Sequence, residues 1–472
     1  MRPAALPGGM LLALLNVVNA ADLLIAGARL WDGSGGAPRE NVDILVRGDR
    51  IATIGPALTA AAGARVLDAR GATVLPGLID SHVHLSMDPG AAWRDDSAAV
   101  HAELLAAHLR AYVACGVTTI LDPGVLPHDS EQITAMLASG VPGPRYLSLG
   151  TPFSPPDGYV STVIPGFPAV ASVAEVERQL DAVLAQGGVG VKVTVEEGFV
   201  GPVWPLHAPG ILRAIAAGAA RHNLTVYVHA MSPREQRMAL DILGARVFVH
   251  PLDRPHALMV AKIARARAYE MTTLSVYDAL EIGRNPARLD DPLFTDNVPP
   301  AERSTARDDS VVRGFERRLL AVTMPALPLK SLAASTPFPR MITRSHLRRT
   351  SVALRAMRSA GVPVVMGSDA GNWPIIPFLF HGPTSIRELE LIGLAGFTPA
   401  EALTAATRTP AEMLGLQSEI GGIRVGGIAD LVVVDGDPLA DLTALRHLRW
   451  TVRAGDARTP AEWRDPAYRP TP

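Results

Sequence analysis

The sequence predicts an α/β fold: a (β/α)8 TIM-type barrel with a small discontinuous β-sandwich domain formed by both ends of the chain. Short apolar runs alternate with helix-like stretches between residues 71 and 419, which is typical of a parallel barrel. Short alternating runs with glycine turns occupy residues 21–70 and 420–458, on either side of the barrel. Because they flank the barrel, we expect them to meet in one composite domain.

Length and composition agree with this architecture. The 472 residues are too many for one small core, and a barrel with an accessory domain accounts for them. A hydrophobic content of 48% with 19% charged residues is that of a globular protein. The formal net charge is −2 and no run is rich in lysine or arginine, so we expect a small-molecule substrate and no nucleic-acid partner. Whether the chain forms a homo-oligomer stays open.

The two ends of the chain carry further expectations. Residues 1–20 combine an early arginine, an apolar stretch and small residues at Val18 and Ala20, as a secretory signal peptide does. The stretch is too short to span a bilayer. We therefore expect export to a periplasm, with no membrane insertion after signal removal; the alternative is a cytoplasmic protein. Residues 459–472 are expected to form a C-terminal tail.

Eight predicted strands build the barrel, and most are separated by helix-like stretches such as 98–114, 173–186 and 209–222. The strands are the run that ends at His82, followed by 117–122, 145–150, 190–195, 225–229, 246–250, 271–277 and 363–369.

Metal-ligand residue types end several of these strands. His82 and His84 close the first apolar run, and period-2 geometry sends both side chains to the same side. Two converging imidazoles form half of a divalent-metal site. Alone, a His-x-His pair is more often an accident. Four later runs, however, contain or end in Lys192, His229, His250 and Asp369. Since barrel chemistry sits at the carboxyl ends of the strands, all six side chains are predicted to face one mouth.

Lys192 is the least expected of the six. It lies inside the β-branched run 189–195, where burial of an ammonium group costs free energy.

These ligands, in this order, resemble those of the amidohydrolase superfamily, most closely its imidazolonepropionase-like and prolidase-like metal-dependent hydrolases. The resemblance also rests on the segments AGARLWDG (26–33), VLPGLIDSHVH (74–84) and GGIADLVVVDGDP (426–438). It covers nearly the whole chain after about residue 21.

The resemblance implies a binuclear centre and a set of roles. His82, His84 and Asp369 would hold one divalent metal, and His229 and His250 the other. Lys192 would react with CO₂ to give a carbamate that bridges both metals. A bridging hydroxide would attack the substrate carbonyl, with Asp369 as the catalytic proton carrier. Zinc suits this nitrogen and oxygen ligand set best, and manganese or cobalt are alternatives.

The expected reaction is hydrolysis of an amide or peptide bond in a dipeptide, an Xaa-Pro substrate or an N-acyl amino acid. Two alternatives within the superfamily are a cyclic-amide hydrolase and a mononuclear deaminase. A non-catalytic barrel is the alternative from another class, and retention of all six ligands argues against it. Relatives often continue after the strand-5 histidine with a second histidine and a glycine. This chain has Ala230-Met231-Ser232-Pro233 instead, which puts inferences about the substrate in doubt.

Substrate contacts are less well specified. Tyr227 lies two residues before His229, and His381 lies twelve residues after Asp369; both are candidates, although Tyr227 also fits a packed barrel tyrosine. Two long insertions, 151–170 and 278–345, emerge on the catalytic face and are candidates to roof the site. The second carries several arginines, which we expect to form a solvated helix face rather than a carboxylate clamp. These are Arg303, Arg307, Arg313, Arg317 and Arg318.

Overall fold

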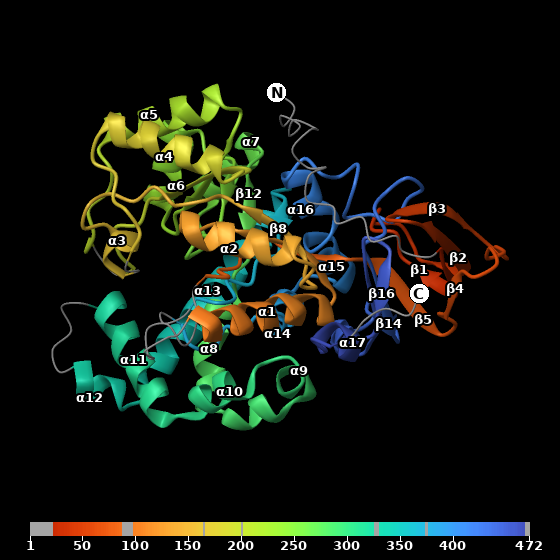
Figure 1. Cartoon of the computed structure of the whole chain (residues 1–472). Helices are drawn as coiled ribbons and strands as arrows, with labels where there is room; N and C mark the ends of the chain where they lie inside the picture. Colours follow the sequence, from red (N-terminus) through yellow and green to blue (C-terminus); the bar gives the residue numbers. More distant parts are fainter. Residues whose placement is uncertain are drawn as a thin grey trace.

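The computed structural model describes residues 22–86, 98–163, 166–199, 202–324, 330–372 and 376–467. The predicted signal peptide lies outside the described residues. The chain forms a central barrel and a terminal β-sheet, which stand side by side in Figure 1. In the part of the chain that the structure describes, no helix combines the length and apolar character needed to cross a membrane.

Eight parallel strands form the barrel, as predicted. They are β6 (Leu78–Asp80), β7 (Val117–Asp122), β8 (Arg145–Ser148), β9 (Gly190–Thr194), β10 (Thr225–His229), β11 (Val247–Phe248), β12 (Tyr269–Met271) and β13 (Val364–Val365). One hydrogen-bonded ladder runs through β6, β7 and β8 in order, and a second runs from β9 through β10, β11 and β12 to β13. Two isolated parallel bridges, Phe153 with Val193 and Val83 with Ala370, close the remaining gaps.

The helices between the strands surround this barrel. They are α1 (Ala98–Ala114), α2 (Pro127–Ala138), α4 (Val173–Ala185), α5 (Pro209–Arg221), α6 (Pro233–Met238), η2 (Ala239–Leu243), α7 (Ala257–Ala266), α8 (Ser275–Arg284) and α13 (Phe338–Ser359), followed after β13 by α14 (Pro383–Leu394), α15 (Pro399–Ala405) and α16 (Arg408–Met413). The two insertions contribute α3 (Tyr159–Val163), η3 (Pro286–Asp290), α9 (Pro292–Thr295), α10 (Pro300–Arg307), α11 (Asp309–Thr323) and α12 (Lys330–Ala334).

The seventh strand is shorter than predicted and ends earlier. We expected a strand over 271–277, but β12 ends at Met271 and α8 begins at Ser275. The buried carboxylate of Glu388 accepts hydrogen bonds from the backbone N–H groups of Leu274 (2.9 Å) and Ser275 (2.7 Å). It thereby satisfies donors that a helix start leaves unpaired. Part of the predicted strand is therefore the first turn of a helix.

Both ends of the chain pair in one mixed sheet. Its strands are β1 (Leu23–Leu30), β2 (Arg39–Arg47), β3 (Arg50–Gly55), β4 (Arg65–Asp68), β5 (Ala72–Pro76), β14 (Leu431–Asp435), β15 (Leu448–Arg453) and β16 (Asp456–Arg458). β5 lies between β1 and β14, so this sheet reaches beyond the predicted boundary at residue 70. Val74 packs in the core of the sheet, while its neighbour Leu75 belongs to the cluster of Leu78, Val117 and the helices that surround the barrel.

The expected C-terminal tail contains a short helix. The 3-10 helix η4 (Leu442–Arg446) precedes β15, and α17 (Pro460–Arg464) follows β16. Trp463 of α17 is buried against Val113 and Ala114 of α1.

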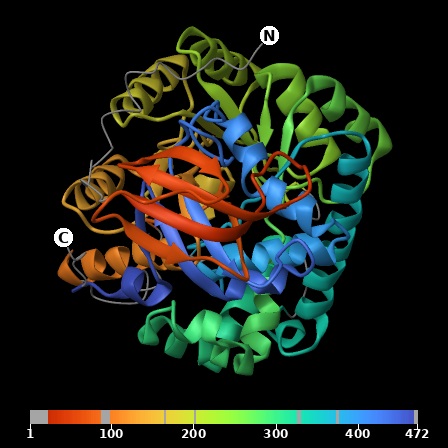
Figure 2. The same cartoon turned by 90° about the vertical axis from the view of Figure 1, so that its right-hand side faces the viewer.

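The terminal sheet and the two insertions lie at opposite sides of the barrel. In Figure 1 the sheet is at the right, and α3, α11 and α12 are at the left. Figure 2 views the molecule from the side of the sheet, with the helices in a ring around it. The end of the barrel away from the sheet is therefore the one that the insertions cover.

Candidate metal centre

All six predicted ligands line one cavity of about 280 Å³. Each lies in or just after a barrel strand. His82 and His84 follow β6, Lys192 lies in β9, His229 ends β10, His250 follows β11 and Asp369 follows β13. The barrel thus brings together residues that are up to 287 positions apart in the sequence (369 − 82).

Three of these side chains converge on a point. Asp369 Oδ1 lies 3.2 Å from His82 Nε2 and 3.2 Å from His84 Nε2, and the two Nε2 atoms are 3.3 Å apart. Among the described residues, these three form the one group of histidine, cysteine, aspartate or glutamate ligand atoms gathered closely enough to hold a metal ion.

Hydrogen bonds to neighbouring groups indicate which ligand atoms of His82 and Asp369 are free of protons. His82 Nδ1 donates to the carbonyl oxygen of Val249 at 3.0 Å, so in the neutral ring Nε2 carries a lone pair. Asp369 Oδ2 accepts from the Asn372 side chain at 3.0 Å, whereas buried Oδ1 has no hydrogen-bond donor in the described parts of the chain. Lone pairs that face one another in a buried site repel. A divalent cation relieves this repulsion, so the residues fit a metal.

The backbone holds Asp369 in a rare conformation. Its φ of 56° lies in the left-handed region, which aspartate tolerates better than most residues. Its N–H donates to the His82 carbonyl at 2.8 Å. Gly367 lies close behind, because a Cβ there would come within 2.8 Å of His82 Cβ. Strands β6 and β13 therefore approach closely enough to bring their ligands together.

His229 and His250 form the second half of the centre. Their ring centroids are 4.4 Å apart, and the His250 ring is 4.9 Å from the His82 ring. His250 Nδ1 is hydrogen-bonded to the Thr273 hydroxyl at 3.0 Å, which leaves Nε2 as its ligand atom. Thr273 itself is held at φ 32°.

Glu196 is a residue that the sequence analysis missed. Its Oε2 lies 3.3 Å from His229 Nε2, and the side chain is buried. A carboxylate that accepts from Nε2–H leaves Nδ1 of His229 as the ligand atom. Burial raises the pKa of Glu196 to about 7, against the hydrogen bond from the Gly198 N–H, and a nearby cation favours the ionised form. Strand periodicity could have found this residue, because Lys192, Thr194 and Glu196 alternate along one face.

Lys192 is buried and lines the cavity. Burial lowers the pKa of its amine to about 8, although Asp369 and Asp122 act in the opposite direction. The neutral fraction of this amine near neutral pH is therefore much larger than that of an exposed lysine.

Four of the other ligands are already in their metal-binding protonation states. Burial lowers the pKa of His229 to about 3 and holds the pKa values of His82 and His250 well below their usual range. Burial alone would raise the pKa of Asp369, but interactions with the neighbouring His82, His84 and Lys192 side chains lower it to about 2. At neutral pH these three histidines are neutral imidazoles and Asp369 is a carboxylate, which are the forms that bind metals.

The two predicted substrate contacts lie outside the cavity wall. Tyr227 is fully buried in the barrel core with Ile79, Leu121 and Met271. His381 is also buried, with its ring 4.0 Å from that of His108 and its Nδ1 2.9 Å from the Tyr112 hydroxyl. Neither residue is among those that line the cavity, so the structure does not place them where a substrate would lie.

Both insertions contribute to the cavity wall. Tyr159, Val160, Val163 and Phe167 come from the first insertion, and residues of α11 and α13 come from the second or follow it. Arg307, Arg313 and Arg317 are exposed, as expected of a solvated face. Arg318 differs from them because it lines the cavity.

The chain is similar to known proteins over most of its length. The family model described as "Amidohydrolase family" matches residues 73–454. An N-acyl-D-glutamate deacylase of Alcaligenes xylosoxydans xylosoxydans is 25% identical over 464 residues, covering 89% of this chain and 88% of that protein. A crystal structure of a prolidase complexed with N-methylphosphonate-L-proline superposes with a TM-score of 0.71 at 22% identity, covering 93% of this chain and 100% of the other.

A shorter match has higher identity. A dihydroorotase of Geobacter sulfurreducens is 39% identical over 120 residues, which are 25% of this chain and 26% of that protein. The chain thus spans about a quarter of the length of this curated relative.

Proposed function

Because the chain belongs to the amidohydrolase family, we propose that it hydrolyses the amide bond of a dipeptide, an Xaa-Pro substrate or an N-acyl amino acid at a binuclear metal centre. The observation that carries this proposal is the convergence of His82, His84 and Asp369 in the cavity that also holds Lys192, His229 and His250.

Two divalent metals account for the ligand set. His82, His84 and Asp369 would hold one ion, and His229 and His250 the other. Zinc fits these nitrogen and oxygen donors, with manganese or cobalt as alternatives. When bound, such ions lower the pKa of water and polarise a carbonyl.

Lys192 would link the two ions as a carbamate. Its neutral amine forms a bond to the carbon of CO₂ and loses a proton, which leaves an anionic carbamate with two oxygens. Support comes from the burial that lowers the pKa of the Lys192 amine to about 8. An anion at this position also removes the cost of a buried ammonium group beside two cations.

Asp369 would carry the proton. Its Oδ1 lies at the convergence point, and its Oδ2 is held by the Asn372 side chain. A carboxylate fixed in this way can accept a proton from the attacking water and deliver it to the leaving nitrogen.

Cyclic-amide hydrolysis is the second candidate. The segment of 39% identity to a dihydroorotase favours it, since the same ligand set can serve a ring amide.

A substrate panel separates these functions. Xaa-Pro dipeptides, N-acyl amino acids and dihydroorotate would be offered to the metal-loaded protein. We expect turnover of an acyclic amide, and a loss of about 10²–10⁴-fold in kcat for Asp369→Asn, because a positioned proton carrier contributes that much. Turnover of the ring amide alone would favour the second candidate. Absence of any C–N hydrolysis would contradict both.

A further inference from the structure

We propose that the outer part of the cavity binds a bulky apolar group of the substrate, so that the preferred substrates are amides of long-chain or aromatic acyl groups. This inference rests on the proposed amide hydrolysis and names the substrate class. Ten apolar or aromatic side chains, called here the apolar chamber, line this part of the cavity beside polar side chains that include Arg318, Thr343 and His346. The ten are Tyr159, Val160, Val163, Phe167, Phe199, Met231, Phe315, Leu319, Ile342 and Ile376.

The chamber is built by segments outside the barrel strands. α3 supplies Tyr159, Val160 and Val163, while α11 supplies Phe315 and Leu319. All of these helices lie on the side of the barrel opposite the terminal sheet (Figure 1). The barrel supplies the ligands, and the insertions supply an apolar surface above them.

Tyr159 connects the chamber to the metal centre. Its ring centroid is 5.1 Å from that of His229 and 6.0 Å from that of Phe199, and Trp204 packs behind it at 4.9 Å. An acyl group that extends from the metal centre past His229 would therefore lie beside an aromatic wall. Aromatic surfaces of this kind favour contact with apolar groups.

Met231 strengthens the assignment. It lies two residues after His229, in the segment Ala230-Met231-Ser232-Pro233, which lacks the second histidine and the glycine often found in relatives. The structure places Met231 in the cavity wall. Its flexible thioether gives the wall an adaptable apolar contact at this position.

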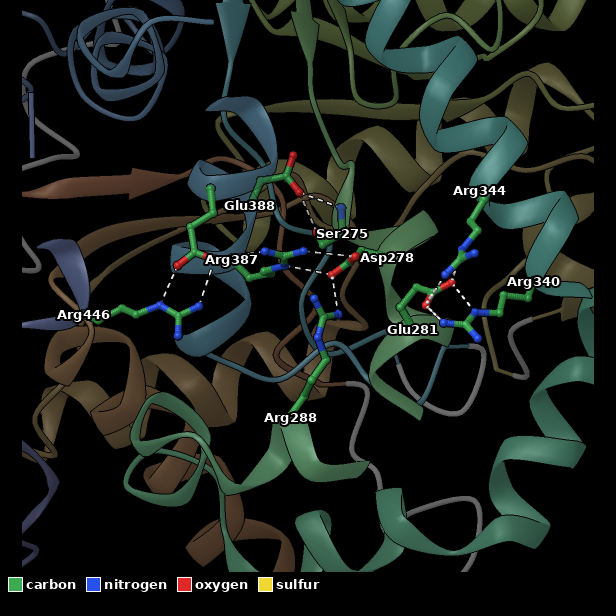
Figure 3. A network of polar contacts seen from close by, with 10 residues as sticks. Ser275, Asp278, Glu281, Arg288, Arg340, Arg344, Arg387, Glu388 and Arg446 are labelled. Atoms are coloured by element: carbon green, nitrogen blue, oxygen red, sulfur yellow. Dashed lines mark hydrogen bonds and ion pairs between the residues drawn. The ribbon is translucent and has the colours of Figure 1, made fainter. Parts of the chain in front are cut away.

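Ion pairs join α13, which carries Ile342, to α8. Glu281 of α8 forms hydrogen bonds with Arg340 and Arg344, one on either side of Ile342 in the sequence. Asp278 of α8 is bound by Arg387 of α14 at 2.8 Å. Figure 3 shows these contacts tying α8 to both neighbouring helices. Ile342 therefore lies on a stretch of α13 that is joined to α8 on both sides of this residue.

The test uses N-acyl derivatives of one amino acid with acetyl, butanoyl and octanoyl groups. Each methylene buried in the chamber is expected to raise kcat/KM about fourfold. The kcat/KM of the octanoyl derivative should therefore exceed that of the acetyl derivative by at least about tenfold. The Ile342→Trp variant fills the chamber and should lower the octanoyl-to-acetyl ratio at least about tenfold. Met341→Trp is the matched control, because Met341 precedes Ile342 on the same helix but is 64% exposed; its ratio should stay that of the wild type.

A second measurement keeps the proposal testable if Ile342→Trp fails to fold or if no amide is turned over. Binding of acetate, butanoate and octanoate to the metal-loaded wild type would be measured by calorimetry. Affinity that rises with chain length supports the chamber even without turnover, in which case only the proposed reaction fails. Affinity and kcat/KM that are both independent of chain length would overturn the inference.

Discussion

At the scale of single residues, three of the ligand histidines are fixed by a hydrogen bond to the ring nitrogen that is not needed for metal binding. The partners are the Val249 carbonyl for His82, the Glu196 carboxylate for His229 and the Thr273 hydroxyl for His250. The ligands themselves were predictable because each ends or follows a strand. Their outer partners lie in the segments that follow other barrel strands, so local sequence patterns do not reveal which of them meet.

Glu196 gives the sharpest prediction at this scale. Glu196→Gln keeps an acceptor for His229 Nε2 but removes the charge. Since outer carboxylates are worth about 10–100-fold in metal affinity, we expect the weaker of the two metals to bind at least about tenfold less tightly. Chelator competition measures this. Glu197→Gln is the control, because Glu197 pairs with Arg234 near the surface. Equal affinities in both variants and the wild type would show that Glu196 does not act through His229.

At the scale of elements, helix boundaries depended on partners distant in the sequence. The helix predicted at 98–114 is present as α1, and it ends at Ala114 as predicted, since its apolar pattern is local. The prediction of a strand over 271–277 was wrong because Glu388, which lies 113 residues after Ser275, caps the start of α8. The packing of α13 on α8 likewise rests on Glu281, whose two arginine partners lie 59 and 63 residues away. No local pattern contains such contacts.

The Glu281 contacts predict a pH-dependent stability. Hydrogen bonds from Arg340, and secondarily from Arg344, lower the pKa of Glu281 from 4.5 to about 2. A carboxyl group whose pKa is lower in the folded than in the unfolded state stabilises the fold at pH values above its unfolded-state pKa. This stabilisation is lost as the pH falls from about 4.5 towards 2. Glu281→Gln should therefore lower the free energy of unfolding by at most about 1 kcal/mol at about pH 6, because the site is partly solvated.

Urea unfolding of the metal-free protein at several pH values checks this. The difference between wild type and Glu281→Gln should shrink below about pH 4.5. Glu177→Gln is a control, since Glu177 forms an exposed pair with Arg221. A difference that is constant with pH would show that the arginine contacts do not set the stability of α8 and α13.

At the scale of the whole molecule, the barrel and the pairing of both chain ends were predictable because they rest on repeated patterns. The alternation of strand-like and helix-like stretches predicted the number of barrel strands. The two β-rich segments that flank the barrel predicted that both chain ends form one domain. The contribution of β5 was missed, because its residues are buried on both faces and read like a barrel strand. The sequence also predicted that both insertions could roof the site, but not which of their side chains line the cavity, since the insertions lie 100 or more residues apart.

Metal content per chain tests the central claim, a binuclear centre linked by Lys192, most directly. Elemental analysis would compare wild type, Lys192→Ala and the control Lys262→Ala, whose lysine pairs with Asp241 at the surface. We predict about two metals in the wild type and the control, and a sharp fall in Lys192→Ala. About one metal in all three proteins would contradict the account and make Lys192 a structural residue.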